Sequence, residues 1–279
     1  MDFRALIVDN GSTDDTTAAV RMAFPQVQII ELEQNKGFAA GANIGLQYAL
    51  QMGSDYILLL NNDTMVDTRL LEELTAWLAP DVGILAPMIY YADPPDVIWS
   101  AGAMRHPWTL EQVNSAQGLR DDRHWPQVVE RDFVTGCAML VSRSMIESIG
   151  LFDECFFMYY EDNDLCLRAR RAGFRLLLVP QAKMWHKVSV SSGGRDSPSE
   201  RYHMARASVL FFRKHAHGWQ RSIIFPYRLG SAIKTVLRLM LRGRPDAARA
   251  YLRGLYHGLQ TKLSMRAAGA EKLLDRGIV

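Results

Sequence analysis

The sequence predicts an α/β fold, in which helices flank a doubly wound, mostly parallel sheet and a basic helical appendage follows at the C-terminus. Strand-like and helix-like segments alternate over residues 3–180, an order that places crossover helices on both faces of a parallel sheet. The chain has 279 residues, of which 48% are hydrophobic. This suits one large domain with an appendage, or two smaller domains.

Start and stop signals support each element up to residue 53. Ser12 or Thr13 can act as the N-cap of a helix with acids in its first turn, and Gly53 suits the end of a second helix. The predicted elements are strand 3–8, helix 13–24, strand 27–32 and helix 38–53.

The alternation continues to residue 180. Tyr56–Leu60 is typical of a strand buried on both faces, and Pro80 follows the end of an amphipathic helix. Residues 88–130, rich in Pro, Trp and charge, predict a loop or a small antiparallel excursion. The predicted elements are strand 56–60, helix 68–78, strand 83–87, strand 132–142, helix 161–173 and strand 174–180.

Composition divides the chain near residue 198. Residues 189–200, "SVSSGGRDSPSE", are typical of a flexible connection, so we predict units at 1–198 and 199–279. Residues 201–279 hold 16 basic against 3 acidic residues, a net +13, while residues 1–200 hold 16 against 27, a net −11. A basic tail can face nucleic acid, anionic lipid or a polyanionic substrate.

Cysteine content and hydropathy limit the class of protein. The 3 cysteines are odd in number and show no CxxC spacing, which argues against a disulfide framework or zinc site and for a reducing compartment. No secretory signal and no apolar run of membrane-spanning length is apparent. We therefore expect a cytoplasmic protein.

Polar clusters follow several predicted strands. They are Asp9–Ser12, residues 35–37, Asn61–Asp63 and Glu161–Asp162. The carboxyl ends of parallel strands share one edge of a sheet, where ligands bind, so we expect these clusters to converge. A carboxylate such as Asp63 can there hold Mg²⁺ or Mn²⁺ bridging phosphate oxygens.

Each cluster also has a purely structural interpretation. Asp63 can cap the following helix, and Asp9 lies in "DNGS", which is favourable turn chemistry. Glu161 and Asp162 can simply favour a helix N-terminus, and residues 35–37 can form an ordinary loop. The spacing alone leaves both interpretations open.

Five segments in order resemble the family 2 glycosyltransferases, inverting enzymes with a GT-A fold. They are "VDNGSTDDT", "NKGFAAGAN", "LLLNNDTMV", "GLFDECFFMYYEDNDLCLRARRAGFRLLLVP" and "WHKVSVSS". The resemblance covers Phe3 to Phe212, and within the family it is strongest to the rhamnosyltransferase-like group that acts on cell-surface and cell-wall polysaccharides.

The resemblance implies a donor site for a nucleotide-diphosphate sugar, with dTDP-rhamnose as the first to test. Asp9 would contact the nucleotide base, where a carboxylate can accept the imide N–H of a pyrimidine. Asn35, Lys36 and Gly37 would lie near the nucleotide and diphosphate, Lys36 offsetting phosphate charge and Gly37 letting the backbone approach. Asn62 is also assigned to this site.

The resemblance also implies the reacting groups. Asp63 matches the last acid of the DxD-like motif and would bind the divalent metal, with Asn61 in place of the first acid, and His186 would complete the metal site. Asp162 matches the general base that deprotonates an acceptor hydroxyl, and Glu161 would raise its proton affinity by like-charge repulsion. The implied acceptor is a glycan or a lipid-linked glycan.

The usual first strand and helix of the family, roughly 30 residues before "VDNGS", have no counterpart. We therefore expect the chain as given to bind its donor poorly or to associate, because a lost strand exposes an unpaired edge. Either the natural start lies upstream or the chain is a shortened variant. A full-length form with no better activity or solubility would contradict this expectation.

Residues 219–242 place basic side chains among aliphatic and aromatic ones. The run is too charged to span a bilayer but suits a helix lying at the inner face of the plasma membrane. Packing on the core, or on a second subunit in a homo-oligomer, fits the pattern equally well. Nucleic-acid binding is not expected, because no basic, aromatic-interleaved sheet or recognition helix is apparent.

Three functions compete on these residues. The first is a metal-dependent inverting glycosyltransferase, and the second is a non-catalytic or impaired relic that still binds a nucleotide sugar. The third, a nucleotidyltransferase on a related sheet, lacks the Gly-rich basic loop expected after its first strand. Replacing Asp162 by Asn separates the first two, since a relic has no transfer to lose.

Overall fold

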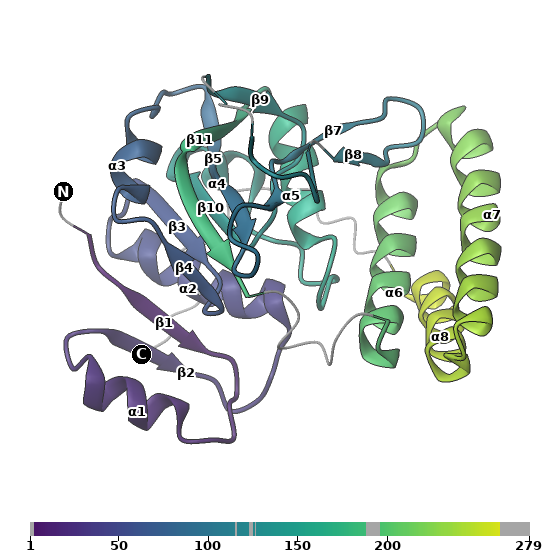
Figure 1. Ribbon diagram of the computed structural model, residues 1–279, viewed down its shortest axis with the longest axis horizontal. Helices are drawn as coiled ribbons and strands as arrows, with labels where there is room; N and C mark the ends of the chain where they lie inside the picture. Colours follow the sequence, from purple (N-terminus) through teal and green to yellow (C-terminus); the bar gives the residue numbers. More distant parts are fainter. Residues whose placement is uncertain (1–2, 115, 123–124, 126, 188–195, 263–279) are drawn as a thin grey trace.

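The computed structural model describes residues 3–114, 116–122, 125, 127–187 and 196–262. It has the predicted α/β architecture with a helical C-terminal region (Figure 1). The helices are α1 (Thr16–Ala23), α2 (Phe38–Gln51), α3 (Leu70–Thr75), α4 (Arg143–Ile149), α5 (Glu161–Arg171), α6 (Pro198–His215), α7 (Gln220–Leu241) and α8 (Pro245–Gln260).

The strands form one large sheet and two small ones. The large sheet has the order β3-β10-β5-β11-β4, with β6 beside β5 and β9 beside β11, and the two-stranded sheets are β1-β2 and β7-β8. The strands are β1 (Leu6–Asp9), β2 (Gln28–Glu31), β3 (Tyr56–Leu60), β4 (Thr64–Val66), β5 (Val82–Tyr91), β6 (Ile98–Ser100), β7 (Ala103–Arg105), β8 (Gln112–Asn114), β9 (Val129–Arg131), β10 (Ala138–Ser142) and β11 (Arg175–His186).

The predicted predominance of parallel pairing does not hold for the large sheet, which is mixed. Within it β5 and β11 pair in parallel, whereas β10 runs antiparallel to both β3 and β5. Among the described residues, no helix carries the chain back between β5 and β10. The chain therefore re-enters the sheet from the edge at which β5 left it, and an antiparallel strand results.

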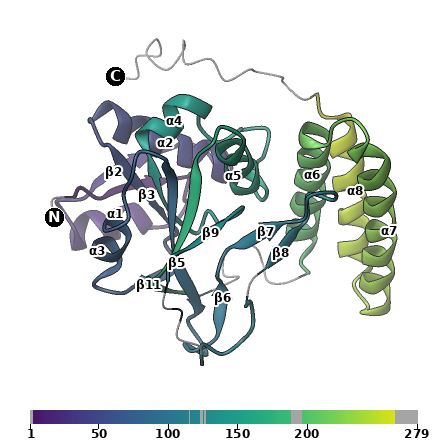
Figure 2. The same cartoon turned by 90° about the horizontal axis from the view of Figure 1, so that it is seen from above.

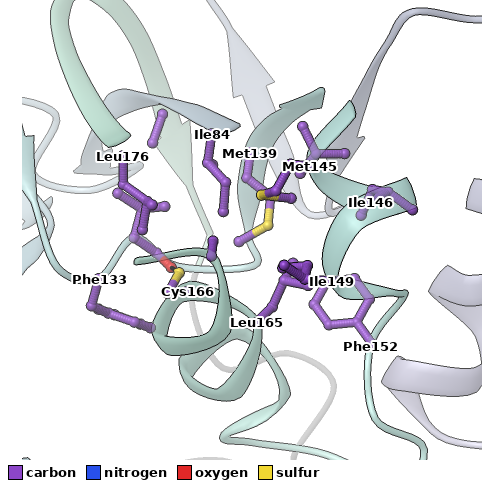
Figure 3. Packing of buried hydrophobic residues seen from close by; sticks show 14 of the residues in the cluster. Ile84, Phe133, Met139, Met145, Ile146, Ile149, Phe152, Leu165, Cys166 and Leu176 are labelled. Atoms are coloured by element: carbon purple, nitrogen blue, oxygen red, sulfur yellow. Dashed lines mark hydrogen bonds between the residues drawn. The ribbon is translucent and has the colours of Figure 1, made fainter. Parts of the chain in front are cut away.

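Helices cover both faces of the large sheet. α2, α4 and α5 bury residues such as Leu46, Met145 and Leu165 against one face, as Figure 3 shows in part. α3 covers the other face through Leu70 and Leu74. Successive strand residues point to opposite faces, so each central strand contributes to both layers of the core.

β1 and β2 form a parallel pair of their own, separate from the large sheet. β3 pairs with β10 on one side, and among the described residues its other edge has no strand partner. The same is true of the edge of β1 that faces away from β2. α2 bridges the two sheets: Leu46 lies in the core beneath the large sheet, and Gly45 lies against Val8 of β1.

Several boundaries differ from prediction. Of the segment predicted as one strand at 132–142, only 138–142 is a strand, β10; residues 132–137 form the loop that follows β9, and α4 was not predicted. β11 extends to His186, farther than the predicted residue 180, and this extension carries the histidine to the sheet edge. Residues 88–130 were predicted to form either a loop or a small antiparallel excursion. They contain antiparallel strand pairs, which agrees with the second form.

The C-terminal helices are attached to the α/β body. Phe211 and Phe212 of α6 pack with Phe156 and Leu167 in one buried cluster, and α8 packs along α6. Figure 2 shows the three helices side by side at one end of the molecule. No described helix combines the length and the apolar character needed to cross a membrane.

Candidate active site

The polar residues predicted after the strands lie at one edge of the two sheets. β1 ends at Asp9, β3 ends just before Asn61, and β11 ends at His186. Hydrogen bonds and close contacts join these ends to the N-terminus of α5, where Glu161 and Asp162 begin the helix. The predicted convergence is therefore present in the structure.

Asp9 is buried and organises the turn after β1. Its carboxylate accepts hydrogen bonds from the backbone N–H of Ser12, at 3.1 Å, and from the Ser12 hydroxyl. The neighbouring Asn10 reaches across to the other loop: its amide donates to the Gly37 carbonyl at 2.9 Å and accepts from the Lys36 N–H at 2.9 Å. Asn10 thus ties the ends of β1 and β2 together, a role that the sequence did not reveal.

The loop at residues 35–37 is held on both sides. Asn35 accepts from the Gly37 N–H at 2.8 Å, and the Phe38 N–H donates to the carbonyl of Phe157 at 2.7 Å. Gly37 has a φ of +86°, and a Cβ there would overlap the Phe157 carbonyl oxygen and lie 2.7 Å from its ring. Lys36 is exposed. This position thus requires glycine for both backbone conformation and space.

Replacing Gly37 by Ala is expected to lower the free energy of unfolding by about 2–4 kcal/mol, because left-handed backbone strain adds to the steric overlap. Gly53→Ala is the matched control. Gly53 has a φ of +83° but nothing within 4 Å of the added Cβ, so only about 1–2 kcal/mol should be lost. Urea denaturation measures both. Equal losses would show that the contact with Phe157 contributes nothing.

Asp63 and His186 meet at the carboxyl edge of the large sheet. β4 and β11 are antiparallel with Thr64 opposite His186, and this register brings His186 Nε2 to 3.1 Å from Asp63 Oδ1. The edge of Trp99 packs against the imidazole, with ring centroids 4.5 Å apart. The second ring nitrogen, Nδ1, is buried and has no hydrogen-bond partner among the described residues.

Asn61 and Asn62 have different roles in the turn between β3 and β4. The Asn61 N–H donates to the carbonyl of Cys137 at 2.9 Å, and its own carbonyl accepts from the Thr64 hydroxyl at 2.6 Å. Asn62 is exposed at the tip of the turn. The backbone of Asn61 therefore holds the turn, while the side chain of Asn62 faces solvent.

The donor set at Asp63 and His186 suits a divalent cation. A carboxylate is a ligand that Mg²⁺ and Mn²⁺ sites use, and an imidazole is a ligand for divalent transition metals, with oxygen ligands filling the other positions. Within the part of the chain that the structure describes, no group of three or more His, Cys, Asp or Glu side chains could hold a metal. A cation here would therefore need several ligands from solvent or from substrate phosphates.

Asp162 lies at the first turn of α5 and points back toward β10. Its carboxylate accepts from the N–H of Gly136 at 3.0 Å. Gly136 also lies close to Phe38: a Cβ added at Gly136 would be 3.4 Å from the phenylalanine ring. The general-base candidate is thereby linked to the loop at residues 35–37.

Burial raises the pKa of Asp162, and hydrogen bonds from backbone N–H groups oppose the increase. The pKa of Glu161 is raised well above its usual range, first by burial and then by the charge of Asp162. The sequence-based prediction attributed the increase at Asp162 to repulsion from Glu161. In the structure burial is the main cause, and the repulsion is felt chiefly by Glu161, so Asp162 ionises first.

Cys137 connects the two acidic groups. Burial, followed by the charges of Asp63 and Asp162, raises the pKa of its thiol to about 12. Both carboxylates therefore lie near enough to influence this one side chain. The metal-ligand candidates and the general-base candidate therefore share one neighbourhood.

Arg105 also lies beside the N-terminus of α5. The sequence did not predict it as a residue of the site. Its guanidinium donates to Asn163 Oδ1 at 2.6 Å and to the Leu110 carbonyl at 3.0 Å. Its positive charge also favours the ionised form of Asp162. It stands in the excursion at 88–130, where the sequence gave no signal for a residue near the site.

Comparison with known proteins agrees with this geometry. The family model described as "Glycosyl transferase family 2" matches residues 1–150. The chain is 28% identical to the N-acetylglucosaminyl-diphospho-decaprenol L-rhamnosyltransferase of Mycobacterium tuberculosis, over 78% of this chain and 76% of that protein. It is 25% identical to the dTDP-rhamnosyl transferase RfbF of Shigella flexneri, over 75% and 71% of the two chains.

Solved structures share the fold at low identity. GalNAc-T7, crystallised with UDP, GalNAc and Mn²⁺, has a TM-score of 0.56 and 14% identity, covering 75% of this chain and 43% of that one. The mannosyltransferase PcManGT of Pyrobaculum calidifontis, in complex with GDP-Man and Mn²⁺, has a TM-score of 0.51 and 17% identity, covering 88% and 64%. These likenesses establish a GT-A fold, and with the family match over more than half of its residues the chain belongs to glycosyl transferase family 2.

Proposed function

We propose that the chain is a metal-dependent inverting glycosyltransferase that moves a sugar from a nucleotide-diphosphate donor to a hydroxyl of a glycan or lipid-linked acceptor in cell-surface polysaccharide synthesis. The observation that carries the proposal is that the Asp63–His186 pair and Asp162 meet at residues 136–137. The Gly136 N–H donates to Asp162, and the Cys137 carbonyl accepts from the N–H of Asn61, two residues before Asp63. The names of the two rhamnosyltransferases support rhamnose as the sugar and dTDP-rhamnose as the donor.

In this proposal the donor lies along the edge formed by the turn after β1 and the loop after β2. Asp9 contacts the pyrimidine base, and Asn35, Lys36 and Gly37 lie along the diphosphate. Gly37 lets the backbone approach the phosphates, and the exposed ammonium of Lys36 offsets their charge. In the β3–β4 turn, Asn61 and the exposed Asn62 complete the donor site.

Asp63 and His186 would hold the metal. Bound there, a divalent cation supplies Lewis-acid stabilisation to the departing nucleoside diphosphate. The packing of Trp99 against His186 fixes the imidazole plane. Nε2 is the nitrogen that faces Asp63 and would be offered to the metal, and the ring proton would then be carried by Nδ1.

Asp162 is the proposed base. Its carboxylate takes the proton of the acceptor hydroxyl while that oxygen forms a bond to the anomeric carbon and the bond from this carbon to the diphosphate oxygen breaks. The attack comes from the face opposite the leaving group, so the configuration inverts in one displacement. Burial favours this role because it raises the proton affinity of Asp162. Glu161 keeps its proton and avoids a second buried charge.

We also propose that residues 1–198 carry the transfer site and that residues 199–279 form a helical layer attached to it. The buried contacts of α6 with Phe156 and Leu167 support an attached layer rather than an independent domain. A cytoplasmic protein held at the inner face of the plasma membrane would meet a lipid-linked acceptor there.

Calorimetric titration with dTDP and UDP, with and without Mn²⁺, tests the proposal first. We expect Mn²⁺ to strengthen nucleotide binding about tenfold or more, a difference of about 1.4 kcal/mol, and Asp63→Asn to reduce affinity to the metal-free value. Asp67→Asn is the control, because Asp67 forms the turn before α3, accepting from the Arg69 N–H at 2.9 Å, and should leave binding unchanged.

Transfer from dTDP-rhamnose to an acceptor, with the product anomer assigned by NMR, completes the test. An inverted product is expected. Metal-independent nucleotide binding, or a product with retained configuration, would contradict the proposal. Nucleotide binding without any transfer would favour a relic.

A further inference from the structure

The outward face of α7 carries a run of exposed apolar side chains. α7 lies at the outer edge of the molecule in both views (Figures 1 and 2). It buries Ile224 and Leu239 toward its neighbours, and its opposite side is apolar yet exposed. The exposed apolar side chains are Ile223, Phe225, Tyr227, Leu229, Ile233, Leu237, Met240 and Leu241.

Helical spacing sorts this face into two rows. Leu229, Ile233, Leu237 and Leu241 recur every four residues and are 64%, 55%, 57% and 89% exposed. Residues four apart lie one above the other on a helix, so they form one apolar ridge. The neighbouring row, shifted by one residue, is basic and consists of Lys234, Arg238 and Arg242. The two rows border a shallow hollow of about 570 Å³.

The charge of this face has one sign. α7 contains no acidic residue. Asp196 is the acid that lies against its basic row, 3.2 Å from Arg242 and 3.9 Å from Arg238. An exposed apolar ridge flanked by cations fits a surface that offers both an apolar interior and negative charge. A bilayer containing anionic lipid offers both.

A second copy of the chain fits less well. A symmetric dimer through this face would be isologous, with the same patch on both subunits. It would bring the two rows of Lys234, Arg238 and Arg242 toward each other, and among the described residues only Asp196 pairs with this row. Like charges brought together in this way oppose association, whereas anionic headgroups neutralise them.

We propose that the outward face of α7 docks on an anionic lipid bilayer. The apolar ridge enters the boundary between headgroups and acyl chains, and Lys234, Arg238 and Arg242 extend to the phosphates. α7 then lies in the plane of the surface, as expected for a helix that does not span. Docking would place the enzyme on the surface that holds a lipid-linked acceptor. This role of the docking surface rests on the proposed function.

Vesicle sedimentation tests the docking surface. The intact chain should bind phosphatidylcholine–phosphatidylglycerol vesicles, and binding should weaken with added salt. Ile233→Glu/Leu237→Glu should lower the partition coefficient at least tenfold, since two exposed side chains can then no longer enter the bilayer. Lys234→Ala should lower it about fivefold on anionic vesicles, the effect of one charge near such a surface, and leave binding to pure phosphatidylcholine unchanged.

A charge-matched control is available on the far side of the molecule. Met22→Glu/Trp77→Glu replaces two exposed apolar side chains on or beside α1 and α3 and should bind vesicles like the unaltered chain. The proposal would be overturned if Met22→Glu/Trp77→Glu bound vesicles as weakly as Ile233→Glu/Leu237→Glu. It would also be overturned if the unaltered chain did not bind vesicles. A dimer in analytical ultracentrifugation that Ile233→Glu/Leu237→Glu dissociates, without vesicle binding, would assign the face to a second copy.

The vesicle assay needs neither donor nor acceptor. Its failure would leave transfer to a water-soluble acceptor intact, while failure of the proposed function would leave vesicle binding unaffected. The two proposals can therefore fail separately.

Discussion

Asp162→Asn is expected to lower kcat for sugar transfer about a thousandfold while leaving nucleotide affinity within about twofold. A positioned general base contributes roughly 10²–10⁴-fold to a rate, and Asn cannot take the proton of the acceptor hydroxyl. The substitution keeps the size of the side chain and an oxygen that can accept from the Gly136 N–H. The loss should therefore fall on the chemical step and not on the fold.

Glu161→Gln is the matched control for this experiment. Glu161 lies beside Asp162 and is buried, and burial followed by the charge of Asp162 raises its pKa well above the usual range, which favours its neutral form. A neutral amide in place of a neutral acid should change kcat less than about tenfold. Steady-state kinetics with dTDP-rhamnose and calorimetry with dTDP separate kcat from donor binding. Equal losses in the two variants would show that Asp162 has no special role as base.

The pH profile of the unaltered enzyme checks the same assignment. Asp162 acts as a base only when ionised, so kcat/KM should fall as the pH drops through its pKa. Because burial raises that pKa, the fall should begin at higher pH than for an ordinary Asp, whose pKa is about 3.9. In Asp162→Asn the residual rate should lack this acid limb. An acid limb that persists in the variant would point to another group.

The strand ends show what could be predicted from sequence. The apolar run Tyr56–Leu60 followed by polar residues indicates a strand that ends in a polar cluster, and β3 is found there. The expectation that this strand is buried on both faces was wrong, because β3 lies at the edge of the large sheet and both of its end residues are exposed. The pairing of Asp63 with His186 required more, because 123 residues separate them. No local pattern reports such a contact, and the resemblance to a known family supplied it.

Other features depend on three-dimensional context that a sequence pattern does not contain. Asn10 looks like an ordinary turn residue, and its bond to Gly37 forms only when two loops meet. The direction of β10 follows from an excursion that returns to the same edge of the sheet, which a count of strands and helices does not reveal. The main cause of the pKa increase at Asp162 is burial, and burial is a property of the whole fold.

Asp164 is the position where a single substitution should cost the most stability. Its side chain is fully buried, and its carboxylate contacts three groups, each at 2.7 Å: Arg168 Nε, Lys214 Nζ and His215 Nε2. Two of these partners lie on α6, so the carboxylate joins the first helix of the C-terminal layer to α5. Burial opposes its ionisation, but the His215 hydrogen bond and the charges of Arg168 and Lys214 outweigh this and hold the pKa of Asp164 well below its usual range.

His215 completes the network as a neutral ring. A guanidinium of Arg171 can only donate, so His215 Nδ1, 3.0 Å from it, must accept. The proton therefore lies on Nε2 and is donated to Asp164. Burial and the nearby cations lower the pKa of His215 despite its bond to Asp164. The carboxylate thus faces two cations and one neutral donor.

Asp164→Ala should lower the free energy of unfolding by about 3–5 kcal/mol, the usual cost of leaving a buried charge without its partner. In the variant Lys214 keeps its ion pair with Asp153 and Arg168 keeps its bond to the Leu151 carbonyl at 2.8 Å, whereas the donor N–H of the buried His215 loses its acceptor. Urea denaturation at pH 7 measures the loss. Glu147→Ala is the control, because it removes an exposed partner of Arg143 at 3.2 Å and should cost less than about 1 kcal/mol.

The pH dependence of this difference has a definite sign. The folded-state pKa of Asp164 lies below the unfolded value of about 3.9, so the stability it contributes is fully present above that value and is lost as the pH falls through the folded pKa. The gap between the unaltered chain and Asp164→Ala should therefore stay constant from pH 7 to about pH 5 and narrow only in stronger acid. A loss below 1 kcal/mol at pH 7 would mean that α5 and α6 are held together by the apolar contacts of Phe211 and Phe212, and that the ionic network merely accompanies them.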